Sequence, residues 1–181
     1  MTVSNGRPTD FETRSAREQR AYDLLDRLGI AYTRADHEAA MTMEDCVAIG
    51  DAIGAPICKN LVLCNRQQTA FYLLLMPGDK PFKTKDLSAQ IQSARLSFAS
   101  EAHLAELLDV LPGSASVLAL QNDTEHRVTL LIDEDVLAVP RFGCHPCQNT
   151  SSLGFATADL TERILPALGR SWQTVALPKY E

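Results

Sequence analysis

The chain has 181 residues, of which 45% are hydrophobic and 22% are charged, a composition typical of one soluble domain with a sizeable core. Its net charge of −6 argues against nonspecific nucleic-acid binding as the main activity. Residues 1–9 are polar, and no apolar run approaches the ~20 residues that a membrane span needs, so we expect a cytoplasmic protein without membrane contact. An odd number of cysteines, five, predicts reduced thiols.

The chain shows no internal repeat, low-complexity tract or linker, so we expect one domain over residues 13–170 between flexible tails at 1–12 and 171–181. In chain order, apolar periodicity and turn signals predict a helix (13–28), a strand (30–34), a helix (42–54), two strands (57–64, 69–76), a helix (84–91), a strand (95–98), a helix (100–110), four strands (116–121, 127–133, 137–142, 153–156) and a helix (158–168). Thr42 with Asp45 resembles a capping box, and Thr84 and Ser100 are expected to cap the helices that they open.

Two pairs of strands are interpreted as hairpins, because a short polar turn separates strand 57–64 from 69–76 and strand 116–121 from 127–133. Hairpins require antiparallel neighbours, whereas a doubly wound fold would need helical crossovers between its strands. The sequence therefore predicts an α/β fold of the mixed α+β kind, with a partly antiparallel sheet surrounded by helices.

Lys59 is the most informative residue, because it lies inside the otherwise apolar strand 57–64. With a side-chain period of two, it shares a face with Leu61 and Leu63 and points toward an apolar interior unless it lines a cavity. Burying an unpaired ammonium is costly, so we expect a cavity that receives something anionic or strongly polar. The alternative is a lysine at the frayed start of the strand that extends to water.

Charge is unevenly placed along the chain. Residues 59–95 hold six basic residues against two acids, whereas residues 96–139 hold one basic residue against eight acids. The first segment is a candidate anion-contacting surface, with an ordinary solvated loop as the alternative. Its basic side chains include Lys80, Lys83, Lys85 and Arg95.

The loop 143–152 concentrates polar and reactive side chains, and three interpretations compete for it. Cys144 and Cys147 could form a redox pair, although no helix is expected to follow them. The two thiols and His145 could ligate zinc, although a structural site needs a fourth ligand. Alternatively, His145 and Asn149 are hydrogen-bonding residues of a pocket.

Several short segments carry a family resemblance when they are taken together. They are ICKNL (57–61), FYL (71–73), KPFKTKDL (80–87), RLSFA (95–99), GSAS (113–116), ID (132–133), HP (145–146) and NT (149–150). In this order they resemble the YbaK and prolyl-tRNA-synthetase-associated editing domains, and most of all the free-standing PrdX, or ProXp-ala, proteins. The resemblance covers roughly residues 20–168 and is specific as a set, although each motif alone is weak.

The resemblance implies a mixed β-sheet or barrel wrapped by helices, in an enzyme that hydrolyses mischarged aminoacyl-tRNA in trans. PrdX-like members remove alanine from tRNA for proline, so the implied substrate is the acceptor end of that tRNA, with prolyl-tRNA synthetase as a candidate partner. Lys59 matches the catalytic lysine of the family. The residues expected to bind the substrate are Asn60, Gly113, Ser114, Ala115, Ser116, Val117, His145 and Asn149. The residues expected to contact tRNA phosphates are Lys80, Lys83, Lys85 and Arg95.

Two features depart from the family pattern. Val117 stands where the G-x-x-x-P loop of the family ends in proline, so we expect a less rigid loop with one more amide donor near the amino acid. The sequence therefore predicts removal of alanine, sparing of proline, and more tolerance for serine than relatives show. Cys144 and Cys147 replace the residues that usually flank the His-Pro pair.

The chemistry needs no cofactor, because an aminoacyl ester is an activated bond whose hydrolysis requires a positioned water and stabilisation of an oxyanion. Neither a G-x-S-x-G elbow nor an H-E-x-x-H helix is present. Lys59 would act near the terminal phosphate or the ester carbonyl, while amides of the Gly113 loop hold the aminoacyl end. The alternatives are a noncatalytic module that binds the tRNA end or a nucleotide, and a redox protein built on the two cysteines.

Overall fold

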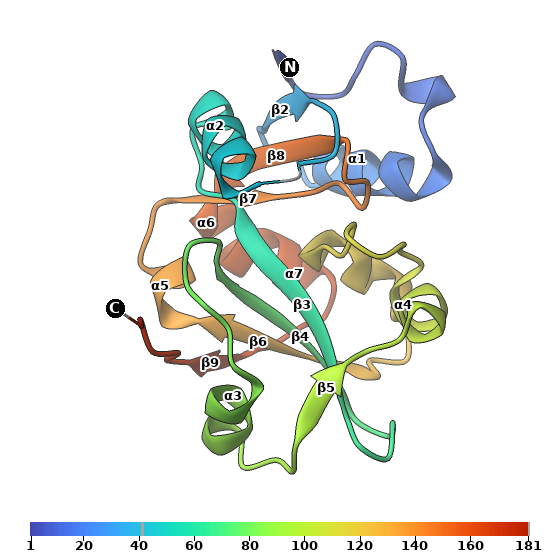
Figure 1. The fold of residues 1–181 in the computed structure, drawn as a ribbon. Helices are drawn as coiled ribbons and strands as arrows, with labels where there is room; N and C mark the ends of the chain where they lie inside the picture. Colours follow the sequence, from blue (N-terminus) through green and yellow to red (C-terminus); the bar gives the residue numbers. More distant parts are fainter. Residues whose placement is uncertain (41, 181) are drawn as a thin grey trace.

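The computed structural model describes residues 1–40 and 42–180 of the chain (Figure 1). The strands are β1 (Thr2–Asn5), β2 (Thr33–Asp36), β3 (Cys58–Asn65), β4 (Phe71–Pro77), β5 (Leu96–Phe98), β6 (Val128–Asp133), β7 (Arg141–Cys144), β8 (Ser151–Ala156) and β9 (Gln173–Val175). The helices are η1 (Phe11–Thr13), α1 (Ala16–Arg27), α2 (Met43–Ile53), α3 (Thr84–Gln90), α4 (Glu101–Leu108), η2 (Val117–Asn122), α5 (Glu134–Leu137) and the consecutive α6 (Thr157–Asp159), η3 (Leu160–Ile164) and α7 (Leu165–Ala167).

The strands form two sheets, which confirms the predicted mixed fold with a partly antiparallel sheet. One sheet has the order β1-β2-β8-β7 and is antiparallel throughout. The other has the order β5-β3-β4-β6-β9, in which β3 is antiparallel to β4 and β5, while β6 is parallel to both β4 and β9. Among the described residues, neither sheet closes into a barrel.

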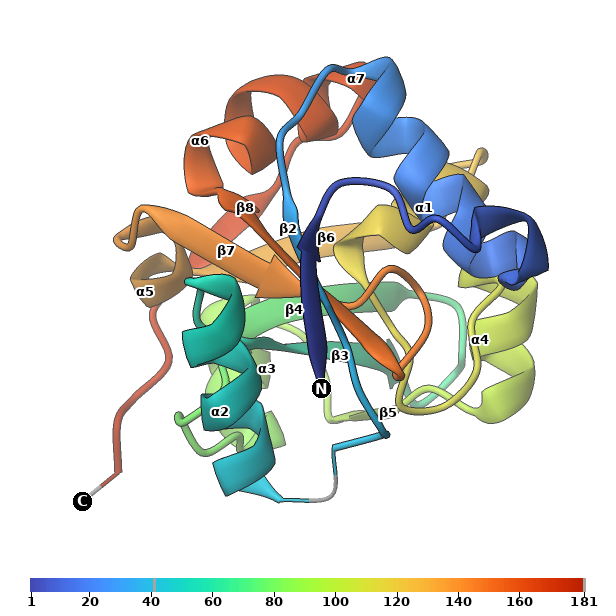
Figure 2. The same ribbon diagram turned by 90° about the horizontal axis from the view of Figure 1, so that it is seen from above.

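The largest apolar cluster lies between the two sheets and includes residues from α1, α4, η2 and the helix α6–α7. Val62 and Leu73 contribute from the five-stranded sheet, and Phe142 and Phe155 from the four-stranded sheet. Two helices cover outer faces: α3 packs below the five-stranded sheet, and α2 packs on the four-stranded sheet (Figures 1 and 2). The candidate site lies where these layers meet.

The two sheets approach each other most closely at the residues that precede β3. A parallel bridge joins Ile57 to Gly143. A Cβ atom on Gly143 would lie 2.6 Å from the carbonyl oxygen of Pro56, and one on Gly78 would lie 2.5 Å from that of Ile57. Glycine is therefore required on both sides of this segment, because a side chain on Gly143 would displace it from the four-stranded sheet and one on Gly78 would displace it from the end of β4.

Local signals predicted several elements correctly. The capping box of α2 is present, with the Thr42 hydroxyl accepting from the Asp45 amide and the Asp45 carboxylate accepting from the Thr42 amide. Ser100 caps α4 through the His103 amide. The hairpin of β3 and β4 also forms as predicted.

Other expectations were wrong. The second hairpin does not exist, because residues 117–122 form the 3-10 helix η2 and β6 pairs in parallel with β4. Thr84 is not the cap of α3, which begins after Lys83 without a side-chain cap. Residues 134–137 form α5, so that β7 starts only at residue 141. Both expected tails contribute strands, β1 paired with β2 and β9 paired with β6.

A buried ion pair explains why the chain turns after η2. Asp123 accepts hydrogen bonds from the amides of Arg127 and Val128, and its carboxylate also accepts from the Arg170 guanidinium at 2.8 Å. Arg170 donates further to the carbonyl oxygens of Val128, Leu120 and Asp123. Burial, the largest single effect, raises the pKa of Asp123, but the hydrogen bonds from Arg170 and from the Val128 and Arg127 amides, together with the Arg170 charge, outweigh it and the pKa is lowered. The pair thus joins the end of η2, the start of β6 and the end of α7.

No helix among the described residues is long and apolar enough to span a bilayer.

We predict that Arg170→Ala lowers the free energy of unfolding by about 3–5 kcal/mol, because it leaves the Asp123 carboxylate buried without its charged partner. Urea unfolding at neutral pH measures the loss. The matched control is Arg127→Ala, which removes an exposed arginine from its pair with Glu106 and should have a much smaller effect. Equal losses in the two variants would contradict the assignment.

Candidate active site

Lys59 lies at the start of β3, and its half-buried side chain lines a cavity. Its ammonium donates a hydrogen bond of 2.7 Å to the backbone oxygen of Lys80. No ion pair joins Lys59 to an acidic side chain within residues 1–40 and 42–180. A positive charge is therefore held at the cavity wall by an acceptor that orients it without neutralising it.

The cavity has a volume of about 220 Å³ and lies between α2, the start of β3, the Gly113 loop and the end of β7. Its lining consists of Met43, Cys46, Ile57, Cys58, Lys59, Asn60, Leu61, Gly78, Gly113, Ala115 and His145. The fold thus brings together five of the residues that the sequence assigned to the site, from three segments spread over residues 59–145. Apart from Lys59, Asn60 and His145, the walls are largely apolar, which suits a small organic group.

Asn60 ties the Gly113 loop to β3. Its side-chain oxygen accepts a hydrogen bond of 3.0 Å from the Val117 amide, and its side-chain nitrogen donates to the Cys58 carbonyl at 3.2 Å. Val117 is 0% exposed. The expectation that this amide is a free donor for the substrate was therefore wrong, because Asn60 already occupies it.

The remaining loop residues divide into those that face the cavity and those that support it. Gly113 and Ala115 line the cavity, whereas Ser114 and Ser116 are buried behind it at 4% and 0% exposure. Ser116 begins η2 by accepting a hydrogen bond from the Leu118 amide. Gly113 has a φ of +81°, a left-handed conformation that favours glycine.

Neutral His145 presents a lone pair to the cavity. Its Nδ1 lies 2.7 Å from the carbonyl oxygen of Ser151, and because a carbonyl only accepts, Nδ1 carries the proton. Burial lowers the pKa of His145, an effect that the Ser151 carbonyl opposes. The imidazole is thus neutral near pH 7, with Nε2 as an acceptor.

Two further polar side chains lie close to the cavity without lining it. Asn149 stands beside the loop, with its nitrogen 3.7 Å from where a Cβ atom of Gly113 would be. The ring of His37 is 6.3 Å from that of His145, and both rings have a nitrogen within 3.4 Å of the Ser152 hydroxyl. These residues can support the position of His145 and the loop.

The two cysteines of the C-x-x-C segment belong to the core. Cys144 and Cys147 are free thiols with 1% and 2% exposure. Burial raises the pKa of Cys147 to about 12 and raises that of Cys144 as well, so neither forms a thiolate readily. This environment does not support the redox alternative. Within the described ranges, no cluster of three His, Cys, Asp or Glu side chains could hold a metal ion.

The predicted tRNA-contacting residues separate into one buried and three exposed side chains. Lys80 is 3% exposed, and its ammonium lies 2.8 Å from Asp133 and 3.1 Å from Asp135. Burial lowers the pKa of Lys80, but its hydrogen bonds to these carboxylates outweigh burial and raise it. The assignment of Lys80 to tRNA contact is therefore corrected: it is a structural ion-pair residue.

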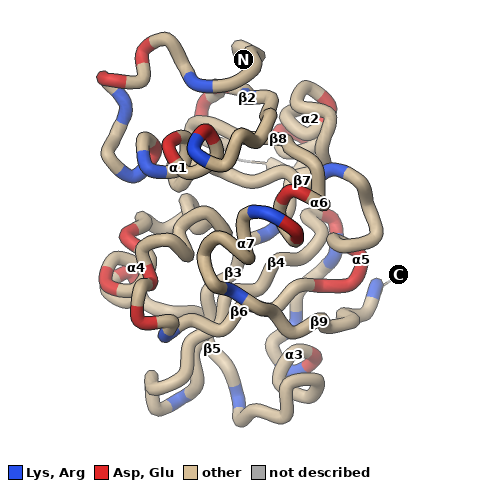
Figure 3. The backbone as a smooth tube through the Cα atoms, turned by 180° about the vertical axis from the view of Figure 1, so that it is seen from behind, with Lys and Arg blue, Asp and Glu red and all other residues tan. Residues whose placement is uncertain are grey.

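Lys83, Lys85 and Arg95 are exposed near α3, as a phosphate-contacting surface requires. The Lys83 ammonium lies 3.6 Å from the ring centroid of Tyr180. Acidic residues gather instead along α4 and α5 (Figure 3).

Sequence reasoning missed the contribution of α2 to the cavity. Met43 and Cys46 line it, and Met43 and Val47 are 50% and 60% exposed. Apolar side chains on the solvent-facing side of a helix can indicate that the helix borders a binding site, but the sequence does not say which cavity they border.

A family model described as an aminoacyl-tRNA editing domain matches residues 37–162. The chain is 30% identical over 153 residues to the prolyl-tRNA editing protein ProX of Acetoanaerobium sticklandii, covering 84% of this chain and 93% of that protein. It is 31% identical over 140 residues to the prolyl-tRNA synthetase associated domain-containing protein 1 of Danio rerio, covering 76% of each.

Solved structures show the same fold at low sequence identity. A crystal structure described as a candidate trans-editing enzyme for prolyl-tRNA synthetase superimposes with a TM-score of 0.67 at 17% identity, covering 92% of this chain and 99% of that one. A scaffold protein used for epitope grafting gives a TM-score of 0.68 at 16% identity, with 93% and 100% coverage.

The lowered pKa of His145 predicts a dependence of stability on pH. In the unfolded chain this histidine takes up a proton near pH 6.5, whereas the folded protein resists protonation until lower pH, so stability falls as the pH drops below about 6.5. His145→Asn keeps a donor for the Ser151 carbonyl but cannot titrate. Urea unfolding at pH 7.5 and pH 5.5 should therefore show a smaller acid loss in this variant than in the wild type. Identical losses would refute the neutral assignment.

Proposed function

The chain belongs to the aminoacyl-tRNA editing domain family, and we propose that it is a trans-acting deacylase that hydrolyses the ester of mischarged tRNA for proline, with alanine as the preferred amino acid. The observation that carries this proposal is the oriented, unneutralised ammonium of Lys59 in a small apolar cavity. A backbone oxygen orients this charge and no ion pair to a described acidic side chain neutralises it, so it can stabilise negative charge that develops in a substrate. One relative is named as a prolyl-tRNA editing protein and another for a prolyl-tRNA synthetase associated domain, and both names support the choice of tRNA.

The geometry supports a division of roles for ester hydrolysis. Lys59 would contact the ester carbonyl or the terminal phosphate, and His145 Nε2 would accept a hydrogen bond from the attacking water, a ribose hydroxyl or the α-amino group. Asn60 would act indirectly, because it fixes the loop that contains Gly113 and Ala115. We expect this reaction in the cytoplasm, with prolyl-tRNA synthetase as a partner that supplies the mischarged substrate.

The size and polarity of the cavity support a small amino acid. Its volume of about 220 Å³ is below the ~300–1,000 Å³ of typical ligand sites. Apolar walls accept the methyl group of alanine. The free energies with which such walls bind two ligands that differ by one small group differ by only ~1–3 kcal/mol. Because Asn60 occupies the Val117 amide, no extra donor stands ready for a serine hydroxyl there, and alanine remains the best-supported substrate.

The test is a turnover assay with catalytic amounts of protein on tRNA for proline charged with alanine, serine, cysteine or proline. We expect rapid hydrolysis of the alanyl ester and sparing of the prolyl ester. A noncatalytic binding module would instead protect the ester from spontaneous hydrolysis, and this outcome would overturn the proposal.

We predict that Lys59→Met lowers kcat for the alanyl ester by about 10²–10³-fold, as removal of a preorganised electrostatic group does in other hydrolytic sites. The melting temperature should stay the same or rise, because a partly desolvated charge is removed. Arg66→Met serves as the control: it removes a cation from the exposed turn of the same hairpin, outside the cavity lining, and should keep the wild-type kcat. A fully active Lys59→Met protein would exclude the lysine from the reaction.

The basic surface provides a second prediction. Replacing both Lys83 and Lys85 with alanine should weaken tRNA binding and reduce the slope of log K against log salt by about 1–2, without changing the choice of amino acid. Lys80→Ala should mainly destabilise the fold, because it leaves the buried Asp133 carboxylate without its charged partner. Equilibrium binding at several salt concentrations and thermal unfolding measure the two effects. An unchanged salt slope in the double variant would place the tRNA-docking surface elsewhere.

A further inference from the structure

A second, larger cavity of about 450 Å³ adjoins the candidate active site. Cys58 lines both cavities, and the Lys59 ammonium donates to the backbone of Lys80, whose side chain borders the larger one. This volume lies within the ~300–1,000 Å³ of sites that bind small organic ligands. A ligand that spans the shared wall would place one part beside Lys59 and another part in the larger cavity.

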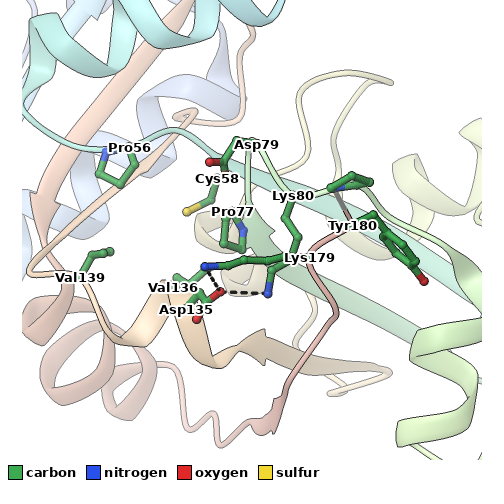
Figure 4. Close-up of a pocket in the computed structure, with 11 residues that line it drawn as sticks. Pro56, Cys58, Pro77, Asp79, Lys80, Asp135, Val136, Val139, Lys179 and Tyr180 are labelled. Atoms are coloured by element: carbon green, nitrogen blue, oxygen red, sulfur yellow. Dashed lines mark ion pairs between the residues drawn. The ribbon is translucent and has the colours of Figure 1, made fainter.

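The walls of this cavity offer flat apolar surfaces. Three prolines, Pro56, Pro77 and Pro81, line it together with Val139 and the aromatic ring of Tyr180. Figure 4 shows Val139 and Tyr180 at opposite ends of the cavity, one from the turn between α5 and β7 and the other from the C-terminal segment. Aromatic and apolar surfaces of this kind stack the unpaired bases of single-stranded RNA.

The charges in the cavity favour a neutral group over a phosphate. Both ammonium groups are already engaged, because Lys80 pairs with Asp133 and Asp135, and Lys179 lies 3.4 Å from Asp135 (Figure 4). Asp79 makes no hydrogen bond or ion pair within the described part of the chain. Carboxylates repel a phosphate but accept hydrogen bonds from ribose hydroxyls and from amino groups on a base.

We propose that this second cavity binds the terminal nucleoside of the acceptor end, the adenosine whose ribose carries the aminoacyl ester. This inference rests on the proposed function, because the ribose would lie at the Cys58 wall with the ester toward Lys59 and the base toward Tyr180. The family match ends at residue 162, so Tyr180 and Lys179 form a wall from outside the matched domain. The Lys80 ammonium holds this segment in place by donating to the Leu177 carbonyl at 2.7 Å.

The first experiment measures KM and kcat separately for hydrolysis of alanyl-tRNA. Tyr180→Ala should raise KM about tenfold with little change in kcat, since loss of an aromatic stacking partner weakens binding of the base. Tyr180→Phe keeps the ring and should restore the wild-type KM, although it loses the hydroxyl that donates to Asp86. An unchanged KM in Tyr180→Ala would overturn the proposal.

A second variant acts from the opposite wall, in case Tyr180→Ala only loosens the C-terminal segment. Val139→Phe fills part of the cavity without touching that segment and should also raise KM while the melting temperature stays near that of the wild type. If Val139→Phe keeps the wild-type KM, the cavity does not hold the nucleoside.

Direct binding separates this inference from the proposed function. Adenosine added to the full chain should shift the amide resonances of Asp79, Val136 and Tyr180, and Val139→Phe should abolish these shifts. If the wild type hydrolyses no aminoacyl-tRNA but adenosine still produces the shifts, the deacylase proposal fails and the cavity assignment stands. If alanyl-tRNA is hydrolysed while adenosine shifts none of these resonances, the deacylase proposal stands and the cavity assignment fails.

Discussion

The buried ammonium of Lys80 holds together the segments that border the candidate active site. It pairs with Asp133 at the end of β6 and with Asp135 in α5, and it donates to the carbonyl of Leu177 near the C-terminus. The backbone oxygen of the same residue accepts the hydrogen bond of Lys59. Because removing one member of a buried ion pair is costly, the loop after β4 has little freedom to move. The position of the catalytic candidate thus depends on a buried ion pair on the far side of the Lys80 backbone, and such fixed support is how a preorganised charge is maintained.

Much of the fold could be predicted because its signals are local. The capping box of α2 and the cap of Ser100 are encoded within four residues, and the hairpin of β3 and β4 is encoded by two apolar runs around a polar turn. The predicted second hairpin had the same local pattern but failed. Val117 to Leu120 are buried on every side, and a continuously apolar run fits a buried strand as well as a short buried helix. The deciding contact, Arg170 on Asp123, comes from 47 residues away.

The sequence predicted several residues of the candidate site, but it did not predict the role of each one. A charge in an apolar strand identified Lys59 without structural information. The sequence could not distinguish Lys80 from Lys83 and Lys85, because all three lie in one basic segment and only tertiary packing buries the first. Val117 illustrates the same limit. Replacing the proline of the family pattern does restore an amide, but the sequence does not say that Asn60 accepts its hydrogen bond.

Lys59 and His145, the two ionisable lysine and histidine side chains in the cavity lining, differ in charge state for physical reasons. Burial disfavours a charge on His145, and the Ser151 carbonyl fixes its proton on Nδ1, so Nε2 stays available as an acceptor. Lys59 keeps access to a backbone dipole and to the open cavity, so its charge is oriented without a carboxylate. A carboxylate paired with Lys59 would neutralise its positive charge before any substrate bound. Protonation of His145 would remove the lone pair on Nε2 that accepts a hydrogen bond. A cation held by a backbone oxygen and a neutral acceptor beside a small apolar space therefore suit an ester whose carbonyl gains negative charge while its attacking water loses a proton.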